Sequence, residues 1–213
     1  MSNEQETFWA TTFGTEYTQR NQQQAMTNAR ALGDFFLRAT RTIRSDDALS
    51  ILELGAGAGQ NLEALNLIYP RAVTAGVEIN PEAARILTDT AVDVLITSAL
   101  NIEPGSLPPA DLVLTKGFLI HIAPADLPRI YALIHASATH AILIAEYYNP
   151  TPVAVPYRGF DNKLWKRDFA GDLLDAYPDL RLVDYGFAYH RGTDSNTYPF
   201  PQDDLTWFLL KKH

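Results

Sequence analysis

Apolar and polar blocks alternate along residues 50–146, and this alternation predicts a repeat of strands and helices. The apolar blocks have the length of buried strands, and proline or glycine interrupts the chain between them. The predicted strands span residues 50–54, 72–78, 92–97, 111–115 and 141–146. The predicted helices between them span residues 60–69, 81–90 and 125–137. Such alternation is typical of a mostly parallel sheet with helices on both faces.

The N-terminal flank has a different pattern from this repeat. Residues 1–30 are polar and carry scattered aromatics, and a helix is predicted over residues 18–39 because apolar residues recur there at three- and four-residue steps. Residues 1–45 are therefore expected to form a helical lid or cap. Residues 46–213 are expected to form the core of what is a single domain overall.

The C-terminal flank predicts a hairpin appended to the sheet. Residues 149–168 contain three prolines and are expected to be an irregular excursion over the sheet edge, followed by a helix at 169–177. Two strands at 180–189 and 205–211 should then pair antiparallel, because no helix separates them. The polar loop between them, about fifteen residues long, is long enough for a functional role. Alternating aromatics on these strands are expected in the core, namely Phe187, Tyr189, Trp207 and Phe208.

Composition and charge exclude several classes of protein. The 213 residues carry a net charge of −8, which is the wrong sign for a nucleic-acid binder. The chain has no cysteine, and its five histidines are scattered, so we expect no metal site. No apolar run is long enough for a membrane span, and the N-terminus lacks the pattern of a secretory signal. We therefore expect a cytoplasmic protein without a membrane partner.

A glycine cluster after the first predicted strand is the strongest candidate for a ligand site. The stretch Glu53-Leu54-Gly55-Ala56-Gly57-Ala58-Gly59-Gln60-Asn61 opens a helix, and its glycines allow a ligand to approach the backbone. Its spacing is GxGxG, with Gln60 where the dinucleotide pattern GxGxxG has its third glycine. The Glu53 carboxylate suits a cationic amino-acid ligand and disfavours a pyrophosphate. An ordinary glycine-rich turn is the alternative.

Two more strand ends face the same edge of the predicted sheet. Glu78 ends the second strand, where a carboxylate can accept both ribose hydroxyls of a nucleoside. A solvated carboxylate at a strand end is the alternative interpretation. Residues 97–100 end the third strand and offer small polar groups and an apolar side chain to an adenine. The three strand ends together predict one crevice at the carboxyl edge of the sheet.

These residues resemble those of class I S-adenosylmethionine (SAM)-dependent methyltransferases. Further blocks resemble the pseudaminic-acid-biosynthesis-associated methylases: FWxxxFGxxYTxRN at 8–21, TKGFLIHIAP at 115–124, EYYNPTPVAVPYRG at 146–159 and LWKRDFAGDLLDAY at 164–177. The resemblance implies a Rossmann-like α/β fold, a mostly parallel seven-stranded sheet with an antiparallel C-terminal strand. One departure is Ser98-Ala99, where many methyltransferases carry an Asp that holds the adenine amine.

The resemblance also implies the cofactor and its site. SAM would be the methyl donor and S-adenosylhomocysteine (SAH) the product, without a metal. The implied cofactor-binding residues are Tyr17, Glu53, Gly55, Ala56, Gly57, Gly59, Asn61, Glu78, Ile79, Ser98, Ala99, Leu100, Lys116 and Gly117.

Candidates for the acceptor side lie beyond this crevice. His121 is a candidate general base, although a histidine in an apolar run is more often a core residue. Tyr17 and Tyr157 are further catalytic candidates. Tyr17, Arg20 and Asn21 either belong to a lid over the cofactor or lie on a simple amphipathic helix.

Residues 158–167 form a basic stretch in this acidic chain, with four cations in ten residues. The stretch predicts an anionic acceptor, although a solvated basic face is the alternative. Guanidinium and ammonium groups suit a carboxylate or phosphate. The predicted acceptor-binding residues are Arg20, Asn21, Glu146, Tyr147, Arg158, Lys163, Lys166 and Arg167.

The sequence thus predicts transfer of a methyl group to an oxygen or nitrogen of a small, anionic, sugar-related acceptor, such as a nonulosonic acid or a nucleotide sugar. A SAM-fold binding protein without turnover is one alternative. A nicotinamide-dependent oxidoreductase is disfavoured because neither GxGxxG nor a Tyr-x-x-x-Lys pair is present. The acceptor atom and the oligomeric state stay open.

Overall fold

The computed structural model describes residues 3–22, 25–43, 49–91, 93–190 and 203–213. The strands are β1 (Ser50–Leu54), β2 (Val73–Glu78), β3 (Asp93–Ile96), β4 (Ala110–Lys116), β5 (Ala138–Glu146), β6 (Val153–Tyr157), β7 (Phe160–Lys166), β8 (Leu180–Ala188) and β9 (Leu205–Lys212). The helices are α1 (Glu4–Ala10), α2 (Thr12–Gln22), α3 (Ala25–Ala39), α4 (Gln60–Ile68), α5 (Pro81–Leu87), α6 (Leu127–Ser137) and α7 (Phe169–Ala176). Two short 3₁₀ helices are η1 (Ala99–Asn101) and η2 (Leu119–His121).

Seven strands form one sheet in the order β3-β2-β1-β4-β5-β9-β8. Strands β1 to β5 pair in parallel, whereas β9 pairs antiparallel with both β5 and β8. This topology is the class I methyltransferase fold, and it confirms the predicted sheet with its antiparallel C-terminal strand. The loop predicted between β8 and β9 lies mostly outside the described residues.

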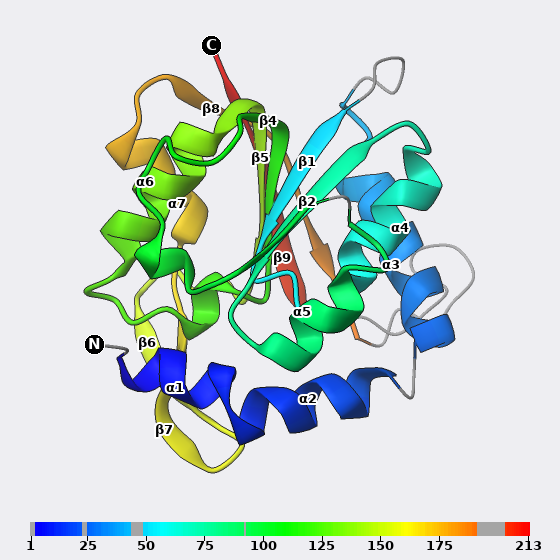
Figure 1. Ribbon diagram of the computed structural model, residues 1–213. Coiled ribbons are helices and arrows are strands. Elements are labelled where there is room, and N and C mark those ends of the chain that lie inside the picture. The colour runs from blue at the N-terminus through cyan, green and yellow to red at the C-terminus, as the bar shows by residue number, and fades with distance from the viewer. Residues whose placement is uncertain (1–2, 23–24, 44–48, 92, 191–202) are drawn as a thin grey trace.

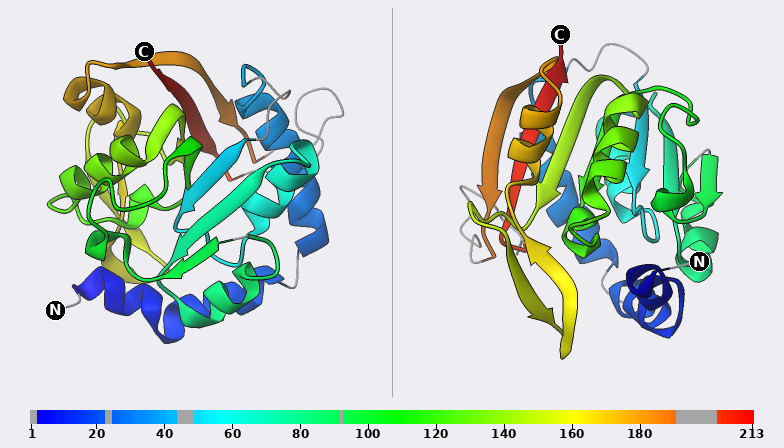
Figure 2. Two further views of the ribbon diagram at one scale, coloured as in Figure 1. Left: turned by 45° about the horizontal axis from the view of Figure 1, so that its top comes forward. Right: turned by 90° about the vertical axis from the view of Figure 1, so that its left-hand side faces the viewer.

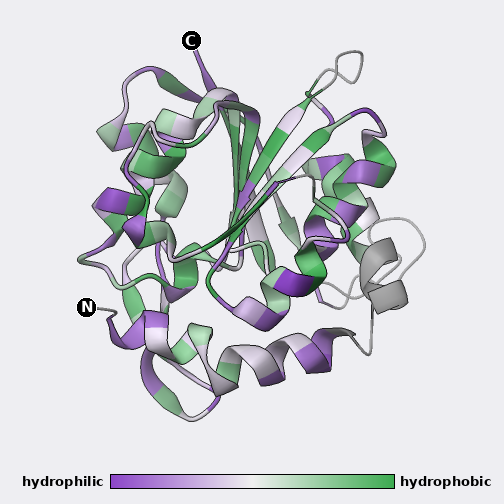
Figure 3. Ribbon diagram, in the orientation of Figure 1, coloured by the Kyte–Doolittle hydropathy of each residue, from purple (hydrophilic) through white to green (hydrophobic). Residues whose placement is uncertain are grey.

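Helices cover both faces of the sheet (Figures 1 and 2). Alternate residues of a strand point to opposite faces, so Ile51 packs with α3 and α4 whereas Leu52 packs with α6 and α7. The central strands β1, β4 and β5 are mostly apolar (Figure 3), because both of their faces are buried. Phe35 and Phe36 of α3 are fully buried in this core, although they fall in the segment predicted as a cap.

Two further helices, α1 and α2, lie along the carboxyl edge of the sheet (Figure 1). The single helix predicted over 18–39 is therefore wrong, since α2 ends at Gln22 and α3 begins at Ala25. Helix α1 was not predicted. The Asn3 side chain accepts from the Glu6 amide while the Glu6 carboxylate accepts from the Asn3 amide, a capping box that starts α1.

The predicted irregular excursion at 149–168 is a two-stranded hairpin, β6–β7, which projects from the same edge as α1 (Figure 2). Pro156 is compatible with β6 because this strand has a single neighbour and needs no hydrogen bond from every amide. Arg158 and Gly159 form its turn with φ angles of 50° and 85°. The three prolines of this segment thus precede or interrupt an edge strand.

The expected burial of the C-terminal aromatics is wrong for two of them. Trp207 is buried, but Phe187 and Tyr189 are 51% and 46% exposed. Phe187 belongs to β8, the edge strand of the sheet, so one side of this strand has no neighbouring strand to cover it. Among the described helices, none is long and apolar enough to cross a membrane.

Candidate functional site

A cavity of about 500 Å³ lies where β1, β2 and β4 end, beneath α1 and α2. It brings together most of the predicted site residues. Those that line it are Tyr17, Asn21, Gly55, Ala56, Gly57, Asn61, Glu78, Ile79, Ser98, Ala99, Leu100, Lys116, Gly117, His121, Tyr147, Tyr157 and Arg158. Those outside its lining are Arg20, Glu53, Gly59, Glu146, Lys163, Lys166 and Arg167.

The glycine loop presents open backbone to the cavity. Gly55, Gly57 and Gly59 have φ angles of 72°, 55° and 85°, in the left-handed region that favours glycine. A Cβ atom at Gly55 would meet the Phe118 ring at 2.3 Å, so this position is filled by protein. A Cβ atom at Gly57 or Gly117 would meet nothing within 4 Å. The space next to Gly57 and Gly117 is therefore where a ligand can touch the backbone.

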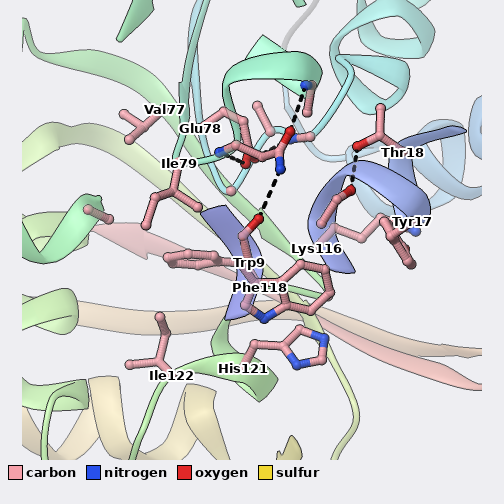
Figure 4. Close-up of a pocket in the computed structure, with 18 of the residues that line it drawn as sticks. Trp9, Tyr17, Thr18, Val77, Glu78, Ile79, Lys116, Phe118, His121 and Ile122 are labelled. Atoms are coloured by element: carbon pink, nitrogen blue, oxygen red, sulfur yellow. Dashed lines mark hydrogen bonds between the residues drawn. The ribbon is translucent and has the colours of Figure 1, made fainter. Parts of the chain in front are cut away.

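Glu78 ends β2 with its carboxylate directed at the glycine loop (Figure 4). One oxygen accepts from the Gly57 amide at 2.8 Å, and the other accepts from the Asn80 amide at 2.7 Å. Burial raises the pKa of this carboxyl group, which is 8% exposed. Each oxygen accepts one of these bonds and has a further lone pair, so the geometry fits a pair of ribose hydroxyls.

Glu53 lies behind the glycine loop and is fully buried. Its Oε1 accepts from the Asn61 side-chain amide at 2.6 Å, whereas its Oε2 has no hydrogen-bond partner in the described part of the chain. Burial raises the pKa of Glu53 to about 8, against the opposing positive charge of Lys116. A cationic group close to the glycine loop would stabilise this unpartnered, buried carboxylate, although Glu53 itself lies outside the lining of the cavity.

The adenine side of the predicted crevice is also assembled. The Ser98 hydroxyl accepts from the Leu100 amide at 3.1 Å and caps η1, so Ser98 to Leu100 are held at the cavity wall. Ile79 lines the cavity beside them. The residues of the glycine loop, Glu78 and Ser98 thus fit a nucleoside linked to an amino acid, which is the chemical form of SAM.

An aromatic wall closes the opposite side of the cavity, formed by Trp9, Tyr17, His121 and Tyr157. The Trp9 ring lies 4.5 Å from the His121 ring and 5.5 Å from the Tyr17 ring, measured between centroids. Tyr157 lies 4.9 Å from His121. Sequence reasoning did not assign Trp9 to the site. The only indication in the sequence is the capping box of Asn3 and Glu6, which starts helix α1, and Trp9 belongs to this helix.

The hydrogen bond of His121 determines which ring nitrogen carries the proton. Nδ1 lies 2.7 Å from the Lys163 carbonyl oxygen, which can only accept, so Nδ1 is the donor. Burial lowers the pKa of His121 to about 4. The neutral imidazole therefore has its free lone pair on Nε2, which is the form required of a general base.

Glu146 occupies a different place from the acceptor contact predicted for it. It is 2% exposed, and its carboxylate accepts from the amides of Phe118 and Leu119 at 3.1 and 3.0 Å. It thereby fixes the loop between β4 and η2, which carries His121. Burial raises the pKa of Glu146 to about 7, and these hydrogen bonds oppose that rise. Tyr147, the next residue, does line the cavity.

The predicted cations have different surroundings. Lys163 is buried and pairs with Glu4 of α1 at 2.6 Å, and Arg167 pairs with Asp172 at 2.7 Å. Lys166 lies over the Tyr147 ring at 5.0 Å. Arg20 lies near Glu16, at 3.8 Å. Arg158 lies in the hairpin turn and lines the cavity, with its guanidinium carbon 5.7 Å from the centroid of the Tyr157 ring. It forms no ion pair with any of the described residues.

No family model matches the chain, and no curated protein is significantly similar to it in sequence. Solved structures do share its fold. The plantazolicin methyltransferase BpumL in complex with SAH is 15% identical, with a TM-score of 0.65 over 98% of this chain and 94% of that one. The magnesium protoporphyrin IX methyltransferase ChlM from Synechocystis PCC 6803, with bound SAM, is 11% identical, with a TM-score of 0.64 over 100% and 99%.

A third similar structure is a TehB-like SAM-dependent methyltransferase from Corynebacterium glutamicum, 16% identical, with a TM-score of 0.60 over 93% of this chain and 97% of that one. All three matches cover 93% or more of this chain. The protein therefore has the class I methyltransferase fold. At these identities the likeness defines the fold, and the chemistry must be argued from the site.

Proposed function

We propose that the protein is a SAM-dependent methyltransferase that acts on a small acceptor with an anionic group. The observation that carries the proposal is the cavity itself, in which a nucleoside site and an aromatic wall with a candidate base face one another. Glu78 and the open backbone at Gly57 suit the cofactor, and His121 suits the acceptor. The solved structures of the same fold, two of them with SAM or SAH bound, support this cofactor.

Methyl transfer requires alignment, exclusion of water and, for a hydroxyl acceptor, removal of a proton. When bound, SAM supplies a methyl group on a sulfonium. The rings of Trp9 and Tyr157 would exclude water from the acceptor side. The free Nε2 of His121 would receive the proton of an acceptor hydroxyl, while Nδ1 keeps its hydrogen bond to the Lys163 carbonyl.

Arg158 supports an anionic acceptor. Of the five cations predicted to bind it, Lys163 and Arg167 are engaged by carboxylates, whereas Arg158 lines the cavity. Its φ of 50° is unfavourable for a residue with a side chain, so the turn would accept glycine or asparagine more readily. A residue with a long side chain in this left-handed backbone conformation is more common at functional sites than elsewhere. Together with the resemblance in sequence, this favours a nonulosonic acid or its nucleotide-linked form.

The experiment has a binding part and a turnover part. Calorimetry should detect binding of SAH and SAM but not of NADH, which separates this proposal from an oxidoreductase. SAH release is then measured with SAM and a panel of sugar acids, nucleotide sugars and neutral sugars. We expect turnover with an anionic member of the panel. Tight SAH binding without turnover on any anionic acceptor would favour a binding protein with this fold, and a preferred neutral acceptor would contradict the role of Arg158.

A further inference from the structure

Asn80 connects the cofactor side of the cavity to the helices that cover it. Its backbone amide donates to Glu78 Oε1 at 2.7 Å. Its side-chain Nδ2 donates to the Trp9 carbonyl oxygen at 3.0 Å and to the Thr15 hydroxyl at 3.2 Å. The residue is 2% exposed. One buried residue thus contacts the carboxylate suited to ribose and the junction between α1 and α2.

The orientation of the Asn80 amide is determined by its partners. Oδ1 accepts from the amides of Glu82 and Ala83 at 3.1 Å and caps α5. Those two groups can only donate, and the carbonyls of Trp9 and Thr11 can only accept, so the amide cannot be reversed. The side chain therefore has two separable tasks, a helix cap through oxygen and a link to α1–α2 through nitrogen.

Gly14 of α2 fits closely against this link. A Cβ atom at Gly14 would lie 1.9 Å from the Trp9 carbonyl oxygen and 2.8 Å from Asn80 Nδ2. The Gly14 carbonyl in turn accepts from the Thr18 hydroxyl at 2.9 Å. The glycine thus allows α2 to approach the link at a distance that a methyl group would prevent.

We propose that Asn80 is a positioning residue that couples binding at the ribose site to closure of α1–α2 over the acceptor site. The proposal rests on the proposed function, since it assigns the ribose to Glu78. The coupling follows the contacts in order, from Glu78 through Asn80 to Trp9, whose ring lies 4.5 Å from His121. Because Trp9 completes the aromatic wall, a cofactor that holds Glu78 and Asn80 in place would also stabilise the closed acceptor site. Cofactor binding should therefore strengthen acceptor binding, and the reverse.

Asn80→Asp separates the two tasks of the side chain. Aspartate is an equally good helix cap, so α5 should be unaffected. Its side chain cannot donate to Trp9 or Thr15. Its second carboxylate oxygen would take the place of Nδ2 and face the carbonyl oxygens of Trp9 and Thr11, which is repulsive. Gly14→Ala disrupts the same link without a change of charge. Gly33→Ala is the matched control, because a Cβ atom at Gly33 of α3 meets nothing within 4 Å.

The readout is hydrogen exchange of residues 4–22, measured with and without SAH. In the parent protein we expect SAH to slow exchange there. In Asn80→Asp and Gly14→Ala we expect faster exchange of α1–α2 without ligand, little slowing by SAH, and SAH affinity reduced by about tenfold, which corresponds to one or two lost hydrogen bonds. Gly33→Ala and the exchange of α5 in Asn80→Asp should match the parent. Once an acceptor is known, its KM should rise in both variants.

Parent-like exchange of α1–α2 in both variants would overturn the proposal. Faster exchange of α5 with parent-like exchange of α1–α2 in Asn80→Asp would also overturn it, since Asn80 would then be a helix cap alone. The ligand-free comparison decides whether Asn80 holds α1–α2 even if the parent binds no SAH. A parent that binds no SAH would contradict the proposed function, which is a different result.

Discussion

Burial keeps the His121 imidazole neutral, and the hydrogen bond of Nδ1 to the Lys163 carbonyl leaves Nε2 free to accept a proton. Because its pKa is lowered to about 4, acidification from pH 7 to pH 5 should not protonate it. We expect His121→Asn to keep a donor to the Lys163 carbonyl but to lower kcat with a hydroxyl acceptor by about 10²- to 10⁴-fold. The pH profile of kcat/KM and the SAH affinity are measured for both proteins. Unchanged kcat in the variant would remove His121 from proton transfer.

Glu78 organises the loop that it faces as well as any ribose. Glu78→Ala should weaken SAH binding by about 1–3 kcal/mol, since charge-assisted hydrogen bonds are lost along with the support of the Gly57 amide. Glu78→Gln is the matched control: its oxygen can keep one of the two backbone bonds, so the loss should be smaller. Calorimetry compares the three proteins. Parent-like affinity in Glu78→Ala would exclude Glu78 from the site.

The hairpin β6–β7 combines a strained turn with a cation that faces the cavity. Arg158→Asn should raise the free energy of unfolding by about 1 kcal/mol, because asparagine tolerates positive φ better than arginine does. It should also raise KM for an anionic acceptor while leaving SAH affinity nearly intact. Arg158→Lys retains both the charge and the strain and should change neither quantity as much. Urea unfolding and initial rates test both effects. A variant that gains no stability, or that binds the acceptor as the parent does, would contradict this role.

The elements that the sequence did not predict are those that close the site. The strands of the core were predictable because burial on both faces leaves continuous apolar runs such as residues 141–145. Helix α1 is only seven residues long, too short for a periodic pattern, and Pro156 conceals an edge strand. Both elements depend on contacts with distant residues, such as Glu4 with Lys163. No local pattern encodes such a contact.

The site residues likewise divide into those that the sequence could predict and those that it could not. The glycine loop and Glu78 were predictable because strand ends and helix starts have recognisable sequences. The place of Glu146 was not, because nothing in the sequence indicates that its carboxylate accepts from the amides of residues 118 and 119, on another loop. The ion pair between Lys163 and Glu4 could not be predicted either, because the two residues are far apart in the sequence. The cations of the basic stretch therefore have different surroundings in the structure, although they are neighbours in the sequence.

Over the whole molecule, buried ionisable groups make stability depend on pH in two directions. The folded pKa of His121 is lowered, so its contribution is complete above its unfolded pKa of about 6.5 and is lost as the pH falls toward 4. The folded pKa values of Glu53 and Glu146 are raised to about 8 and about 7. Their contribution is complete below an unfolded pKa of about 4.5 and is lost as the pH rises through 7 and 8.

Between pH 6.5 and pH 8, therefore, Glu53 and Glu146 act together with Glu78, whose pKa is also raised, and the free energy of unfolding should fall by an amount on the order of 2 kcal/mol. Glu53→Gln removes the group with the larger shift and should at least halve this fall. Saturating SAM should also reduce it, if a cationic group of the ligand stabilises ionised Glu53. Urea unfolding at both pH values, with and without SAM, measures all three. Equal stability of the parent at pH 6.5 and pH 8, or the same fall in Glu53→Gln, would show that Glu53 is already ionised in the folded protein.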